Sequence, residues 1–161
     1  MFIPTILSVF SRLSSGTWRT PHLHHRASLP VGPLRVLVAD DEPANVFLAQ
    51  AMLEQFGCTV NNAEDGLCAW SAWRDAAFDL LVLDLSMPGL GGAQMAERIR
   101  AEELAAGRSR VPIVLYTAYP RDEVEALLDG ATFDAYLGKP LDRSELQRVI
   151  ELAATSSEGG R

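Results

Sequence analysis

Lys139 is the only lysine of this 161-residue sequence, in which the other 13 basic residues are all arginine. It lies in the short stretch YLGKP, directly before a proline. Lysine is a compact point charge on a flexible stem, whereas arginine is a planar fork suited to bidentate pairing. A site that needs one small cation at the tip of a strand would select lysine. Taken alone, Lys139 is better explained as a stray surface residue, so the rest of the chain has to decide.

Four other residues with charged or reactive side chains follow short apolar stretches: Asp40, Asp41, Asp84 and Thr117. Three carboxylates brought close together repel one another, and a divalent cation removes that cost. Oxygen ligands with open positions suit Mg²⁺, which takes one or two carboxylates together with a phosphate oxygen. A carboxylate nucleophile, a metal, a hydroxyl and an ammonium together describe phosphoryl transfer onto an aspartate, with Lys139 as the counter-charge to the phosphoryl group.

Alternating strands and helices are predicted from residue 34 onward. Apolar runs predict strands at 34–40, 58–63, 79–84, 111–117 and 132–138. Helical spacing and end signals predict helices at 43–57, 64–77, 91–107 and 120–131, and a last one that Asp142 caps and that ends near Ala154. Five strands alternating with five helices predict an α/β fold with a doubly wound parallel sheet. The candidate residues are then expected at the carboxyl edge of that sheet.

The first helix is expected to pack with the face formed by Leu48, Met52 and Phe56. Asp40 and Asp41 also have a structural explanation, because either could cap this helix, which opens at Pro43. Asp84 is harder to explain in that way, since it follows four apolar residues and would lie at the mouth of the core.

The composition of the chain excludes several classes of function. The net charge is −7, yet residues 1–33 hold three arginines and no acid, whereas the remainder has 11 basic and 21 acidic residues. An acidic body argues against nucleic-acid binding, which relies on a basic face. All three histidines fall in the first 33 residues, so the body cannot use histidine for catalysis or metal binding. Cys58 and Cys68 do not have a metal-ligand spacing, and a reducing cytosol is the simplest setting.

Residues 1–33 are predicted to be a disordered or artefactual leader. Its apolar start, MFIPTILSVF, is too short to span a bilayer, so no membrane association is expected. The rest of the leader is rich in Ser, Pro, Gly and His without periodicity, as is typical of disorder. Residues 155–161 are expected to be a disordered tail, which leaves 34–154 as the folded domain.

Four stretches together resemble the receiver domain of two-component response regulators: VLVADDEP, LLVLDLSMPGLGG, VLYTAYP and AYLGKP. The resemblance covers residues 34–154 and implies a flavodoxin-like (βα)5 receiver fold. It implies that the protein is a cytoplasmic phosphoacceptor and not an enzyme. The phosphoryl group would be received on Asp84 from a histidine kinase or a histidine phosphotransfer protein. Phosphorylation would then switch binding to a downstream protein. The long stretch AEELAAGRSR, and Asn45, resemble receivers of hybrid sensor kinases.

The same resemblance assigns roles to individual residues. The residues implied for phosphoryl transfer are Asp84, Lys139 and Thr117. The Mg²⁺ ligands implied are Asp41, Asp84, the backbone carbonyl of Ser86 and, through water, Asp40. Thr117 and Tyr136 would form the switch pair, and the Lys139–Pro140 bond would be cis. Ser86 and Tyr119 would tune the loss of the phosphoryl group, and a bulky Tyr119 beside a small, uncharged Ser86 predicts a long-lived phosphorylated state.

Other readings are weaker. An aspartyl phosphatase would need a second acid two residues after Asp84, where the chain has Ser86. A flavin-binding domain would need a phosphate loop in place of the acidic DDEPAN, and GLGG is not a dinucleotide fingerprint. Only seven residues follow Ala154, which favours a single-domain regulator without DNA-binding output. The strongest rival is a receiver-like interaction module that no longer takes phosphate, against which the intact set of charged residues speaks.

Overall fold

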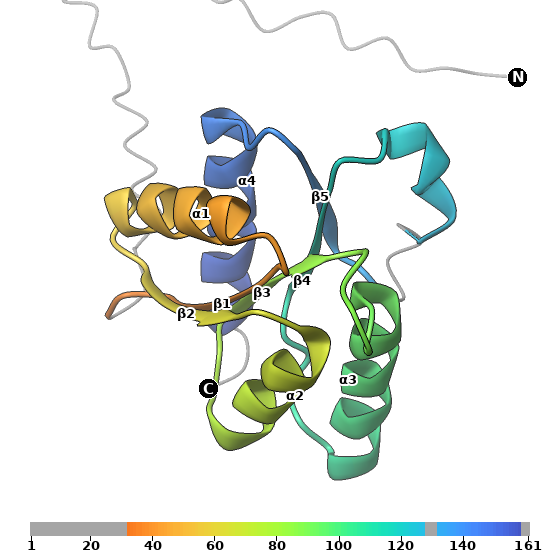
Figure 1. The fold of residues 1–161 in the computed structure, drawn as a ribbon. Helices are drawn as coiled ribbons and strands as arrows, with labels where there is room; N and C mark the ends of the chain where they lie inside the picture. The colour runs from red at the N-terminus through yellow and green to blue at the C-terminus, as the bar shows by residue number, and fades with distance from the viewer. Residues whose placement is uncertain (1–31, 128–131, 159–161) are drawn as a thin grey trace, which may run out of the picture.

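The computed structural model of the protein describes residues 32–127 and 132–158. Its sheet has five parallel strands in the order β2-β1-β3-β4-β5 (Figure 1). The strands are β1 (Arg35–Ala39), β2 (Thr59–Ala63), β3 (Leu80–Asp84), β4 (Ile113–Thr117) and β5 (Ala135–Gly138). The predicted doubly wound sheet is confirmed. The strand order reverses at β1, which lies between β2 and β3.

Within the described residues, four α-helices cover the two faces of this sheet (Figure 1). α1 (Pro43–Gln55) and α4 (Arg143–Glu158) pack on one face, and α2 (Gly66–Asp75) and α3 (Gly92–Ala106) pack on the other. Each face has its own core, represented by Leu53 and Leu146 on the first and by Trp73 and Ile99 on the second. β3 and β4 are buried along their whole length, as central strands of a parallel sheet are.

The packing face of α1 differs from the predicted one. Ala49 and Leu53 are buried against the sheet, whereas Leu48 is 41% exposed and Met52 and Phe56 only border the core. Because α1 is apolar over most of its length, two neighbouring rows of side chains satisfy the helical spacing. The row that contains the small Ala49 faces the sheet.

The helix predicted at 120–131 is not formed within the described part of that segment. Two short 3₁₀ helices, Arg121–Glu123 and Glu125–Leu127, take its place, and residues 128–131 lie outside the described ranges. The amide of Val124 donates to the carbonyl of Arg121 over 3.2 Å, an i to i+3 contact. Short helices depend on tertiary packing for their stability. Val124 is the one buried side chain described between 121 and 126, which leaves this segment few core contacts.

The last helix continues beyond its predicted end at Ala154 and reaches Glu158, so the predicted tail is helical over 155–158. Hydroxyl groups at this end donate to backbone carbonyls one turn earlier, as in the bond from Ser157 Oγ to the carbonyl of Ala153. Ser157 also donates to the carboxylate of Asp79 over 3.2 Å, which holds the helix end against the sheet. None of the helices described here is long and apolar enough to cross a membrane. The predicted leader, apart from residues 32 and 33, lies outside the described residues.

Candidate functional site

The reversal of strand order brings three carboxylates to one point at the carboxyl edge of the sheet. Asp40 directly follows β1, and Asp84 is the last residue of the neighbouring β3. Carboxylate oxygens of Asp40, Asp41 and Asp84 lie within 4.8 Å of one another. Asp40 and Asp84 are only 1% and 6% exposed, whereas Asp41 faces solvent. The cluster is thus closed at its base and open at one side.

Lys139, which follows β5, inserts its ammonium between the two buried carboxylates. Its Nζ lies 2.5 Å from Oδ2 of Asp40 and 3.0 Å from Oδ1 of Asp84. The amide of Lys139 donates to the carbonyl of Thr117 over 2.9 Å, which fixes the backbone next to β4. The Lys139–Pro140 bond is cis, as the resemblance implies. The sole lysine is therefore held at the carboxylates by the sheet itself.

The two carboxylate oxygens of Asp40 have different contacts. Oδ1 accepts hydrogen bonds from the amide of Glu42, at 2.9 Å, and from Nδ2 of Asn45, at 3.3 Å, which fixes the turn into α1. Oδ2 is buried and accepts no hydrogen bond, so its contact with Lys139 is an ion pair alone. Neither Asp40 nor Asp41 caps α1, because its N-cap is Glu42 and no side chain makes a cap hydrogen bond there. Asp40 instead fixes the turn before the helix with one oxygen and contacts Lys139 with the other. A buried carboxylate oxygen without a hydrogen bond is well suited to a hard cation or to its bound water.

The charges of the cluster are coupled. Burial raises the pKa of Asp84, and the negative charges of Asp40 and Asp41 add to this, although the hydrogen bond and charge of Lys139 oppose it. Burial acts to lower the pKa of Lys139, but its close contacts with the carboxylates of Asp40 and Asp84 and their negative charges together outweigh burial, and the pKa is raised overall. One ammonium therefore does not fully compensate three carboxylates, and the donor set fits an additional divalent cation such as Mg²⁺.

Gly92 supports the backbone of Asp84. A Cβ at Gly92 would lie 2.1 Å from the carbonyl oxygen of Asp84, so no other residue fits there without displacing the end of β3. The amide of Gly92 also donates to the carbonyl of Leu85 over 3.1 Å. Ser86, predicted to supply a carbonyl ligand and to tune the reaction, is exposed in the loop between Asp84 and α3.

The predicted switch residues are linked through the loop after β4. Thr117 is buried at the end of β4, and its Oγ1 accepts a hydrogen bond from the amide of Tyr119 at 3.2 Å. The hydroxyl of Tyr136, in β5, donates to the carbonyl of Tyr119 at 2.9 Å. The Tyr119 side chain is 48% exposed. Thr117 and Tyr136 thus meet at the backbone of Tyr119.

Two residues at the site were not predicted to touch its charged groups. Asn45 was noted only as a feature of hybrid-kinase receivers, and the structure shows that it binds Asp40. Tyr116 was assigned only to a strand, and its ring lies 4.7 Å from Nζ of Lys139. The signal for Asn45 is its position in the first turn of α1, close to the acids. No local signal marks Tyr116, because its contact with Lys139 depends on the register between β4 and β5.

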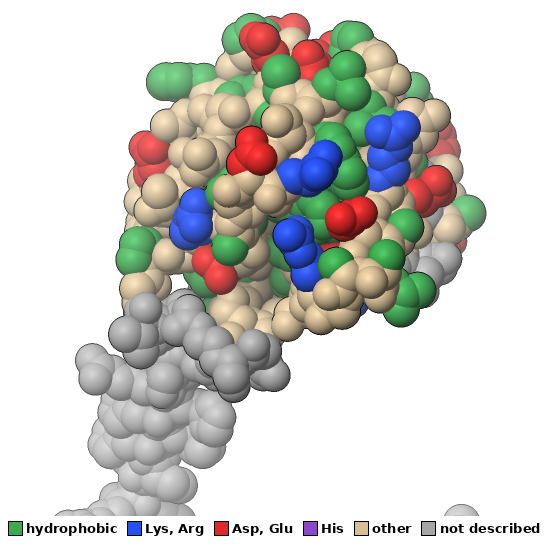
Figure 2. Space-filling model, turned by 90° about the horizontal axis from the view of Figure 1, so that it is seen from below, with side chains coloured by type: hydrophobic (Ala, Val, Ile, Leu, Met, Phe, Trp, Pro, Cys, Tyr) green, Lys and Arg blue, Asp and Glu red, His purple; other side chains and the backbone are tan. Residues whose placement is uncertain are grey.

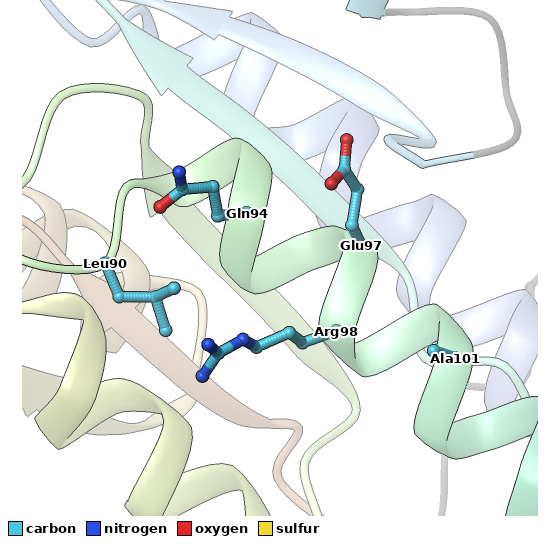
Figure 3. A pocket seen from close by; sticks show the side chains of 5 residues that line it. All are labelled: Leu90, Gln94, Glu97, Arg98 and Ala101. Atoms are coloured by element: carbon cyan, nitrogen blue, oxygen red, sulfur yellow. The ribbon is translucent and has the colours of Figure 1, made fainter.

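Two other hollows lack a comparable set of groups. A hollow of about 430 Å³ lies along α3, where the side chain of Arg98 extends toward Leu90 (Figure 3). Another, of about 450 Å³, is lined by Trp73 and by Glu103, whose carboxylate is already paired with Arg100 at 2.8 Å. On the face of the molecule in Figure 2, basic side chains are spaced among hydrophobic and acidic ones. Neither hollow brings several carboxylates and an ammonium together.

Known proteins give an independent test of the fold and family. Residues 36–151 match the response regulator receiver domain family. The chain is 40% identical over 116 residues to the sensor protein GacS of Pseudomonas syringae pv. syringae, which covers 72% of this chain and 13% of that protein. It is 37% identical over 133 residues to the virulence sensor protein BvgS of Bordetella pertussis strain Tohama I, which covers 81% of this chain and 11% of that protein. The chain thus spans only a small part of the length of these relatives.

A solved structure adds the three-dimensional comparison. The protein is similar to the receiver domain of the sensor histidine kinase PA1611 from Pseudomonas aeruginosa PAO1, at 30% identity and a TM-score of 0.67. The similarity covers 77% of this chain and 99% of that one, and that crystal structure has a magnesium ion coordinated in its active site cleft. Sequence match and fold agree, and they show that this chain belongs to the response regulator receiver domain family.

Proposed function

We propose that this protein accepts a phosphoryl group on Asp84 from a phosphohistidine of a histidine kinase or of a histidine phosphotransfer protein. The observation that supports this most directly is the ammonium of Lys139, held between the buried carboxylates of Asp40 and Asp84 at 2.5 and 3.0 Å. A buried cation at this place stabilises negative charge at one defined point. Among candidate nucleophiles, Asp84 is the carboxylate that ends a central strand and also contacts this cation.

The transfer exchanges one bond to phosphorus for another. A carboxylate oxygen of Asp84 attacks phosphorus, the bond from phosphorus to the donor's imidazole nitrogen breaks, and that nitrogen keeps the electron pair. The product is an acyl phosphate on Asp84. Lys139 is close enough to follow the negative charge as it passes to the phosphoryl oxygens. The hydroxyl of Thr117, at the end of β4, is free to donate its hydrogen to one of these oxygens, because its contact with Tyr119 uses it only as an acceptor.

The acidic cluster fits Mg²⁺, which we propose as the required cofactor. Asp41, Asp84 and the carbonyl of Ser86 would hold the ion, and Asp40 would bind through water. When bound, Mg²⁺ would neutralise the carboxylates and the oxygens of the incoming phosphoryl group. Asp41, which faces solvent, is the member of the cluster best placed to meet an ion that enters from water.

We further propose that the protein is a cytoplasmic signalling component that passes its signal through protein contacts and has no substrate turnover of its own. The acidic body, with 21 acidic against 11 basic residues after residue 33, supports a protein partner rather than DNA as the target. The long relatives of this chain carry a matching segment within sensor proteins, which supports a place in a phosphorelay.

The direct test is incubation of the protein with Mg²⁺ and acetyl phosphate, followed by intact-mass analysis. The wild type should gain one phosphoryl group, and Asp84→Asn should gain none. Asp75→Asn, which removes an exposed acid at the end of α2, is the matched control and should label like the wild type. Excess chelator should abolish labelling. A folded wild type that takes up no phosphate would overturn the proposal and favour a phosphorylation-independent interaction module.

A further inference from the structure

The ammonium of Lys139 has a third contact besides the two carboxylates. Its Nζ lies 4.7 Å from the centroid of the Tyr116 ring, within the distance of a cation–π interaction. Tyr116 is 1% exposed, so the ring meets the ammonium in a place from which water is largely excluded. An aromatic face attracts a cation without adding a negative charge to the cluster.

The pairing of β4 with β5 places Tyr116 and Lys139 next to each other. Tyr116 pairs with Leu137 in the register of β4 and β5, so Lys139, two residues further, is its diagonal neighbour. The distance of 4.7 Å from Nζ to the ring centroid shows that the long lysine side chain reaches the ring across this diagonal. Tyr116 belongs to the core on the α1 and α4 face, together with Leu137. The ring is thus wedged in the core and cannot leave the lysine without repacking.

The three contacts differ in what happens to them during the proposed transfer. Once Asp84 becomes an acyl phosphate, one of its oxygens is bonded to phosphorus and the negative charge lies further out, on the phosphoryl oxygens. Lys139 must then shift toward those oxygens. The attraction of a ring face depends less on direction than a hydrogen bond does, so the ammonium can shift across the ring and remain attracted to it. Tyr116 is suited to support the cation both before and after the transfer.

We propose that Tyr116 is a positioning residue, whose ring holds the Lys139 ammonium in line with Asp84 and guides it toward the phosphoryl group. The inference rests on the proposed phosphoacceptor function. Its two parts, the contact and its effect on the rate, can be tested separately.

The contact can be measured directly because the chain has one lysine. Protein grown with ¹³C,¹⁵N-lysine gives a single set of lysine side-chain signals. The Cε protons of Lys139 should be shifted upfield by the ring current in the wild type and in Tyr116→Phe, and should move toward ordinary values in Tyr116→Leu. Phe133→Leu removes a ring of the other core cluster and is the control for lost packing. An unchanged lysine shift in Tyr116→Leu would overturn the contact.

The effect on the reaction is measured as the rate of labelling by acetyl phosphate at saturating Mg²⁺. Tyr116→Leu should be slower by about fivefold or more, the loss expected from one desolvated cation–π contact. Tyr116→Phe should recover most of the rate, and Phe133→Leu should keep it. Should Tyr116→Leu fail to fold, Tyr116→Met serves as the second ring-free variant. A ring-free variant with the wild-type rate, or Tyr116→Phe as slow as Tyr116→Leu, would overturn the inference. If the wild type itself takes up no phosphate, the proposed function fails, while the lysine signals still report on the contact.

Discussion

The hydroxyl of Tyr136 donates a 2.9 Å hydrogen bond to the backbone carbonyl of Tyr119, and this ties β5 to the loop that follows β4. The amide of the same Tyr119 donates to Oγ1 of Thr117 at 3.2 Å. Both predicted switch residues therefore hold one peptide segment, from opposite ends of Tyr119. We therefore expect a change in the contacts of Thr117 to alter those of Tyr136 through this segment.

The first prediction follows from this link. When the Thr117 hydroxyl turns to a phosphoryl oxygen, its contact with the Tyr119 amide is lost, and Tyr136 is released to repack. Backbone amides in 118–127 and 132–137 should then exchange hydrogen at a different rate in the presence of Mg²⁺ and beryllofluoride. Tyr136→Phe, which lacks one hydrogen bond of about 1 kcal/mol, should already show part of this change without the phosphoryl mimic. Identical exchange in both states would rule out the coupling.

The positions of the reactive residues could be predicted from sequence because apolar runs mark buried strands and polar residues mark where they end. Such strand ends are marked by Asp40, Asp84, Thr117 and Lys139. Because the strands are parallel, their carboxyl ends lie at one edge of the sheet and bring these residues together. The face of α1 could not be predicted as well, because an almost continuously apolar helix offers more than one row at helical spacing. The segment 120–131 has a helical pattern, but pattern alone does not supply the tertiary contacts that a short helix needs.

The contact between Tyr116 and Lys139 was missed for a different reason. It depends on the register between β4 and β5, which places Tyr116 opposite Leu137. Nothing in the local sequence of either strand states that register. Similarly, the sequence allowed Asp40 to cap α1, whereas in the structure one of its oxygens fixes the turn before the helix and the other contacts Lys139.

The second prediction concerns Gly92. An added Cβ would lie 2.1 Å from the Asp84 carbonyl oxygen, so Gly92→Ala should displace the end of β3 and slow labelling by tenfold or more, on the order expected when a reacting group is moved by about 1 Å. Gly91→Ala is the matched control, because its Cβ would meet the carbonyl of Leu85 at 3.2 Å, which a small adjustment relieves. The measurement is the rate of labelling, with thermal unfolding alongside. Equal rates for the two alanine variants would contradict the prediction.

The third prediction concerns pH. Burial and the neighbouring acids raise the pKa of Asp84 in the folded state, so the folded protein binds more protons than the unfolded chain between the two values. The contribution of Asp84 to the free energy of unfolding should therefore fall as pH rises from about 4 through the raised pKa. Asp84→Asn has no such proton to lose. Its stability relative to the wild type, measured by urea unfolding without Mg²⁺, should increase across this range and then stay constant. If the stability of Asp84→Asn relative to the wild type decreased with pH, the charge of Lys139 would outweigh burial and the pKa of Asp84 would be lowered.

The fourth prediction concerns the metal. Mg²⁺ at 100 times its dissociation constant should stabilise the wild type by about 2.7 kcal/mol and raise its unfolding midpoint by several degrees. Asp41→Asn should lose most of this gain at the same concentration, because it removes one ligand from the open side of the cluster. Asp75→Asn, an exposed acid at the end of α2, should keep it. Equal midpoint shifts in all three proteins would mean that Mg²⁺ binds elsewhere.

The last prediction is the lifetime of the phosphorylated state. Water removes the phosphoryl group by attack in line, opposite Asp84, and Ser86 and Tyr119 are the side chains expected to flank that approach. Ser86 is short and uncharged, so it can neither hold a water firmly nor activate one. Tyr119 is 48% exposed, and hydrogen bonds to Thr117 and Tyr136 fix its backbone just after β4, so we expect its ring to lie near the end of that strand. A ring there excludes water, as closing lids do.

Loss of the Tyr119 ring should therefore shorten the lifetime of the phosphorylated state. Decay of the phosphorylated protein, followed by intact mass after removal of the donor, should be severalfold faster for Tyr119→Ala than for the wild type. Tyr119→Phe is the matched control and should decay at the wild-type rate, since it keeps the ring. Ser86→Asn should also speed decay, because an amide can orient a water toward phosphorus. If Tyr119→Ala decays no faster than the wild type, the ring does not shield the acyl phosphate, and the lifetime is set by Ser86 and the Mg²⁺ ligands alone.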